Sequence, residues 1–140
     1  PYIRRVHAAN GLSNAHVPNA ILGPAPGKVD FHVRDQILSS SMTRFEGEAP
    51  PETHQIDMLS AAEVFADLAP SVLICDIEGA EVDLIPSLPL DTLRAAIIEL
   101  HPQWIGPEGV NKVFSAFMQA GMAYYHRGSH NKVVAFRREW

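Results

Sequence analysis

The chain has 140 residues, of which 46% are hydrophobic and 19% charged, a composition typical of one globular domain with its own core. The formal net charge is −5, and the arginine pairs at 4–5 and 137–138 are isolated, which argues against nucleic-acid binding. No apolar run approaches the roughly 18 residues that a membrane span needs, and no signal peptide is recognisable. The single cysteine, Cys75, fits a reducing compartment, so we expect a cytoplasmic protein.

The first third of the chain predicts one helix end and two strands. Residues 1–13 are typical of a helix that ends at Asn10-Gly11, since glycine is a common residue just past a helix. Residues 16–22 are short and apolar enough for a strand, and residues 27–33 alternate apolar and polar side chains, as a half-buried strand does. Residues 39–53 lack any periodicity and predict a loop.

The rest of the chain alternates strands and helices. Ser60-Ala-Ala-Glu63 is a capping box, which predicts a helix that ends at Pro70-Ser71. The following elements are then expected in chain order: a strand at 72–76, a helix at 80–85, a strand at 95–100, a helical stripe at 110–118, and strands at 122–125 and 133–136. Continuous apolar strands that alternate with helices predict an α/β sheet covered on both faces.

Two buried strands end in titratable side chains. Asp76 and Glu78 follow the strand at 72–76, and Glu99 and His101 follow the next one. In open α/β sheets, ligands bind beyond the carboxyl ends of the strands. If the two strands are parallel neighbours, these side chains come within reach of one another. Two carboxylates and a histidine can serve as a general base or as ligands of a hard cation.

Simpler interpretations of the same residues stay open at this point. Asp76 and Glu78 could cap the next helix and bind loop amides, and His101 could merely end its strand. Gly79 permits a tight strand-to-helix turn. Cys75 lies within a strand, so we interpret it as a packing residue rather than a nucleophile.

Several stretches resemble one enzyme family. LICDIEGAEVDLI at 73–85, followed by LRAAIIELHP at 93–102, resembles the C-terminal half of the FkbM-like methyltransferases, which depend on S-adenosylmethionine. Asp-Ile-Glu-Gly-Ala-Glu at 76–81 is the most specific part. NGLSNAHVPNAILG at 10–23 is similar to the family's segment around its third strand, and FHVRDQILSSSM at 31–42 to the serine-containing loop that follows. The likeness covers essentially the whole chain.

The resemblance implies a Rossmann-like class I methyltransferase sheet, mostly parallel with an antiparallel C-terminal strand. Residues 1–140 would form the C-terminal part of a single methyltransferase domain. The implied reaction is transfer of a methyl group from S-adenosylmethionine to a hydroxyl oxygen, with a sugar or a secondary metabolite as the small-molecule acceptor.

The resemblance also implies roles for individual residues. Asp76 is the first candidate for the base or the acceptor-orienting group, and His101 is the second. Glu78 and Glu99 would lie at the same catalytic crevice. The implied cofactor-binding residues are Ala20, Ile21, Ser41 and Asp76. No metal site is implied.

The chain departs from the family pattern in two ways. Ile74 stands where the family commonly has a lysine, so an expected positive partner of Asp76 is missing. The family's glycine-rich loop after the first strand and the acid that ends the second have no counterpart here. We therefore expect a fragment that lacks the first two strands, with an open edge on the strand before Asp76. Such a fragment would bind S-adenosylmethionine weakly or not at all, and it would either self-associate through that edge or depend on segments that this sequence lacks.

Two other functions compete with methyl transfer. A carboxylate- or metal-dependent hydrolase would use Asp76, Glu78 and His101, and would lose divalent-metal binding in Asp76→Asn. A non-catalytic interaction module would tolerate alanine at both acidic positions.

Overall fold

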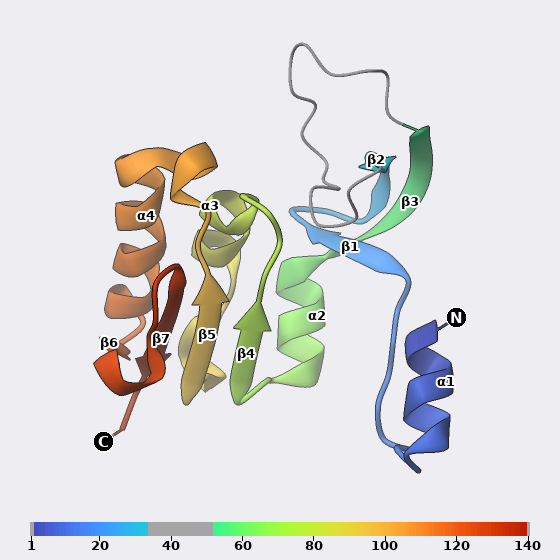
Figure 1. Cartoon of the computed structure of the whole chain (residues 1–140), viewed down its shortest axis with the longest axis horizontal. Coiled ribbons are helices and arrows are strands. Elements are labelled where there is room, and N and C mark those ends of the chain that lie inside the picture. The colour runs from blue at the N-terminus through green and yellow to red at the C-terminus, as the bar shows by residue number, and fades with distance from the viewer. Residues whose placement is uncertain (1, 34–51, 140) are drawn as a thin grey trace.

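The computed structural model describes residues 2–33 and 52–139 (Figure 1). Its main elements are α1 (Tyr2–Ala9), β1 (Ala20–Gly23), β2 (Gly27–Val33), β3 (Glu52–Ser60), α2 (Ala61–Leu68), β4 (Val72–Cys75), α3 (Glu81–Leu84), β5 (Ala95–Glu99), α4 (Pro102–Gln119), β6 (Ala123–Tyr124) and β7 (Val133–Arg137). Among the described residues, no helix is both long and apolar enough to cross a membrane. Most of the predicted loop at 39–53, with Ser41, lies outside the described residues.

The described strands form two separate sheets, a three-stranded one in the order β1-β3-β2 and a four-stranded one in the order β4-β5-β7-β6. The predicted α/β class is confirmed. The expectation of a mostly parallel sheet is wrong, because only β1 with β3 and β4 with β5 are parallel among the described pairs. β7 runs antiparallel to β5, as expected for the C-terminal strand. β6 and β7 are joined by a short connection, which suits antiparallel pairing, whereas a parallel pair needs a longer crossover.

Strand β3 is the main element that the sequence did not predict. Its first two residues, Glu52 and Thr53, fall in the predicted loop, and residues 54–59 had no assignment. The first four residues of β3 are exposed, so no apolar alternation marks them. They are strand because β3 pairs on both sides, in parallel with β1 and antiparallel with β2. That pairing is non-local and leaves little trace in the segment itself.

The predicted helices form, with differences at their ends. α1 ends just before Asn10-Gly11, and Gly11 has a φ of 68°, the left-handed conformation that glycine adopts at little cost. The Ser60 side chain accepts a hydrogen bond from the Glu63 amide at 3.3 Å, as the capping box predicts. α4 begins at Pro102, eight residues before the predicted stripe, because a kink at Gly106 joins a first turn to the main helix.

The core lies on one face of the four-stranded sheet. Cys75 and Ile98 face it from the strands, Phe117 faces it from α4, and Phe117 stacks on Phe136 at a centroid distance of 4.4 Å. The opposite face is less covered than predicted. Val72, Ile74 and Ile97 alternate with the core residues and are exposed. The prediction of helices on both faces is therefore wrong for the described residues.

The three-stranded sheet lies on the far side of α2 from β5, beyond the edge of the four-stranded sheet (Figure 1). β4 forms that edge, and no described strand pairs with its outer side. The open edge that the sequence predicted is thus present in the described part of the chain. β1 lies opposite the end of β4, and the candidate site lies between the two strands.

Candidate functional site

The backbone after β4 turns sharply and brings two carboxylates to one side. β4 ends at Cys75, and the next residues, Asp76 and Glu78, are no longer extended strand. Glu78 has a φ of 55° and Gly79 a φ of 102°. A left-handed conformation costs about 1 kcal/mol or more for a residue with a side chain, and such strain concentrates at functional sites. The two acids therefore converge through a strained turn, not through the simple alternation of a strand.

Gly79 is required in this turn for a second reason. A Cβ atom added there would lie 3.3 Å from the Trp104 ring, closer than most side chains allow. The absent side chain lets the turn approach the first turn of α4. Trp104 in turn stacks on His101, with ring centroids 5.2 Å apart and ring planes at 13°.

The parallel pairing of β4 and β5 brings His101 to the same rim. Cys75 is opposite Ile98 in the register, so the segments that follow both strands leave the sheet together. His101 Nε2 lies 3.2 Å from Glu78 Oε2 and 3.8 Å from Asp76 Oδ1. One potential ligand atom from each of these residues lies within 4.8 Å of the others. We call Asp76, Glu78 and His101 the rim cluster.

Glu81 supports the rim cluster from the protein interior. Its side chain is fully buried, and its Oε1 lies 2.9 Å from His101 Nδ1. The same oxygen accepts a hydrogen bond from the Ile77 amide at 3.4 Å. Because Oε1 acts as an acceptor for the amide, we assign the Nδ1 hydrogen of His101 as a donor to it. This contact fixes the ring orientation of a buried histidine.

Glu81 is the functional residue that sequence reasoning missed. It is the last acid of the Asp-Ile-Glu-Gly-Ala-Glu stretch and opens a helix, where an acid is commonly an exposed partner of the helix dipole. The sequence does contain a signal for the burial of Glu81, because this position lies among residues that must pack against the sheet. Its partner, however, is twenty residues further along the chain.

Cys75 is a packing residue, as its position in a strand predicted. Burial, together with the nearby carboxylates of Glu81 and Asp76, raises the pKa of its thiol to about 12. The thiolate is the nucleophilic form of cysteine. Near neutral pH this side chain therefore stays a neutral thiol in the core.

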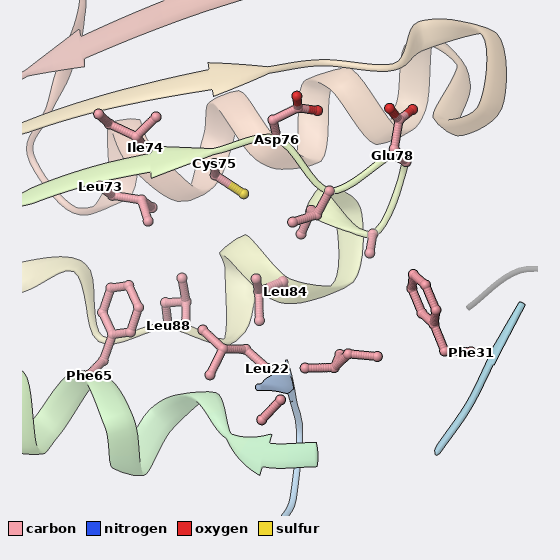
Figure 2. Close-up of a pocket in the computed structure, with 14 residues that line it drawn as sticks. Leu22, Phe31, Phe65, Leu73, Ile74, Cys75, Asp76, Glu78, Leu84 and Leu88 are labelled. Atoms are coloured by element: carbon pink, nitrogen blue, oxygen red, sulfur yellow. The ribbon is translucent and has the colours of Figure 1, made fainter. Parts of the chain in front are cut away.

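An apolar cleft of about 460 Å³ lies between β1 and the end of β4. Figure 2 shows Leu22, Leu84 and Leu88 around its interior, with the carboxylates of Asp76 and Glu78 at its edge, directed away from these side chains. Pockets for small molecules have this size and this character, mostly apolar with a few polar groups. We call this hollow the apolar cleft.

The structure brings together some of the predicted site residues and not others. Ala20, Ile21 and Asp76, three of the four predicted cofactor-binding residues, all line the apolar cleft. The fourth, Ser41, lies outside the described residues. Of the predicted catalytic residues, Asp76, Glu78 and His101 form the rim cluster.

Glu99 is not part of the rim cluster. It is the last residue of β5 and pairs with Val133 of β7. Its place in the strand alternation puts it with Ile97, on the face opposite the buried Ile98.

No match to the chain was found among protein-family models, curated proteins or solved structures. The resemblance of the motifs therefore remains a prediction.

Proposed function

We propose that the chain carries the catalytic part of an S-adenosylmethionine-dependent O-methyltransferase with a Rossmann-like architecture. One observation carries this proposal. The rim cluster, at the carboxyl ends of two parallel strands, adjoins an apolar cleft lined by Ala20, Ile21 and Asp76. Ligands of open α/β sheets bind at such a place. The motif resemblance to the FkbM-like family points to the same chemistry.

The proposed reaction needs a base beside the acceptor oxygen. The oxygen attacks the methyl carbon of the sulfonium, the carbon–sulfur bond breaks, and its electron pair remains on sulfur in S-adenosylhomocysteine. The proton of the acceptor hydroxyl passes to a carboxylate. Asp76 is the favoured base, because 57% of its side chain is exposed whereas His101 is buried. His101 and Glu78 would then orient the acceptor and Asp76.

The apolar cleft is the proposed place of the cofactor. Its leucine and phenylalanine side chains suit the adenosyl group, and the edge of the cleft carries the carboxylates that a sulfonium cation favours. The acceptor would approach the methyl group from the rim, on the solvent side of Asp76. We propose a hydroxyl of a sugar or a secondary metabolite as that acceptor, in a cytoplasmic setting.

A nuclear magnetic resonance titration with S-adenosylhomocysteine tests this proposal. Chemical-shift mapping detects weak as well as tight binding. The amide signals of Ala20, Ile21 and Asp76 should shift together and saturate. Adenosine alone should shift Ala20 and Ile21 less. Absence of saturable shifts in these residues, or shifts centred on another part of the chain, would contradict the proposal.

A non-catalytic interaction module is a second candidate, favoured by the open edge of β4. Ile74 is 75% exposed on this edge strand, and unpaired apolar edges pair readily with other chains. The partner we propose is a second copy of the chain. Such a module would keep its binding when Asp76 and Glu78 are both replaced by alanine.

Self-association should therefore depend on Ile74. Sedimentation velocity at rising concentration should show dimers of the wild-type chain, and Ile74→Lys should remain monomeric because a lysine on the edge opposes pairing. Leu68→Lys is the matched control, since Leu68 is 70% exposed but lies on α2. A wild-type chain that stays monomeric, or equal effects of the two lysines, would argue against this edge as an interface.

A further inference from the structure

The geometry of the rim cluster points to a divalent-cation site, and we propose that Asp76, Glu78 and His101 bind a first-row transition-metal ion. This inference goes beyond methyl transfer and does not depend on it. The resemblance implied no metal, whereas the residue pattern alone left a cation site open. The inference rests on three features of the cluster: the tautomer of His101, the spacing of the ligand atoms, and the exposure of the site.

The first feature is the lone pair of His101. Glu81 Oε1 accepts the hydrogen bond from His101 Nδ1–H, so Nε2 is the ring nitrogen that is directed toward the two carboxylates. That nitrogen faces Glu78 Oε2 at 3.2 Å and Asp76 Oδ1 at 3.8 Å. Three acceptor atoms that face one another repel unless a positive charge lies among them. A proton on Nε2 would bridge this nitrogen to one oxygen, whereas a metal ion would engage all three atoms.

The second feature is the spacing of these atoms. Carboxylate oxygens and imidazole nitrogens bind ions such as Zn²⁺ at about 2.0–2.2 Å. Neighbouring ligands in octahedral or tetrahedral geometry then lie about 3.0–3.6 Å apart. The contacts of His101 Nε2 with Glu78 and Asp76, at 3.2 and 3.8 Å, are close to this range. The three ligand atoms lie within 4.8 Å of one another, and the exposed Asp76 side chain would have to move toward the ion to complete the arrangement.

The third feature is the asymmetry of the surroundings. His101 is buried and held by Glu81, which is the carboxylate–histidine arrangement that orients metal ligands and increases their basicity. Asp76, in contrast, is largely exposed and leaves room for water or a substrate oxygen on the ion. Two carboxylates with one imidazole suit Mn²⁺ and Zn²⁺ better than Ca²⁺, which takes six to eight oxygen ligands.

Titration of Mn²⁺ into the ¹⁵N-labelled chain tests the site. Bound Mn²⁺ should first broaden the amide signals of Asp76, Glu78 and His101, and Zn²⁺ should compete with it while Ca²⁺ does not. Asp76→Asn and Glu78→Gln should each weaken Mn²⁺ binding by at least about 10-fold. Asp83→Asn is the matched control, because Asp83 is an exposed acid in α3 whose partner is Lys112. It should bind Mn²⁺ as the wild type does.

Two outcomes would overturn the inference: equal Mn²⁺ affinity of the wild type and both rim variants, or broadening centred on other residues. Both rim side chains are at least partly exposed, so these variants should fold, and their amide spectra check this. The result is separable from the proposed function. Mn²⁺ binding without any effect of S-adenosylhomocysteine would keep the metal site and remove the methyltransferase.

Discussion

Glu81→Ala should lower the free energy of unfolding by about 3 kcal/mol, because it breaks a buried hydrogen-bonded pair. The substitution leaves the buried Nδ1 of His101 and the Ile77 amide without their acceptor. It also leaves a cavity in the interior below the rim cluster. Urea denaturation followed by circular dichroism measures the change.

Asp83→Ala is the control for this variant. Asp83 lies two residues further on in α3, and its side chain is largely exposed 3.5 Å from Lys112. Exposed ion pairs contribute little to stability, so this variant should resemble the wild type. Equal stability of Glu81→Ala and Asp83→Ala would show that the contact between Glu81 and His101 does not hold the site together.

Phe117→Ala should cost about 3–5 kcal/mol of stability, the usual range for removal of a buried aromatic side chain. Phe117 is fully buried and stacks on Phe136, which joins α4 to the centre of the four-stranded sheet. Met118→Ala is the control, because Met118 is the next residue of α4 and is 65% exposed. It should change stability by less than about 0.5 kcal/mol.

The substitution Phe117→Ala should also disturb the side chains at the rim cluster. α4 carries Trp104 in its first turn and Phe117 near its end, so loosening of the helix weakens the stacking of Trp104 on His101. Thermal unfolding and the tryptophan fluorescence of the folded state measure the two effects. A loss of stability no larger than that of Met118→Ala would place the centre of the core elsewhere.

Much of the four-stranded sheet could be predicted because its strands are short apolar runs with clear ends. β4 and β5 each bury one face, and Asp76 and Glu78 follow the end of β4 at the rim of the sheet. Those two facts are local, and together with parallel pairing they place Asp76 and His101 at one rim. The capping box at Ser60 is equally local, since donor and acceptor are three residues apart.

The features that could not be predicted depend on distant partners. β3 is polar at its start and is strand because β1 and β2 pair with it. In the sequence, Glu81 resembles an exposed acid at the start of a helix. Only the fold shows that its carboxylate is hydrogen-bonded to His101 in the interior. The left-handed turn at Glu78 was also unexpected, because a residue other than glycine rarely adopts it.

A crystal structure of the chain grown with S-adenosylhomocysteine and Mn²⁺ tests the central claim most directly. We expect density for the adenosyl group in the apolar cleft, against Ala20 and Ile21. We also expect an anomalous peak among Asp76, Glu78 and His101. Ligand density elsewhere on the chain, with no peak at the rim cluster, would contradict it.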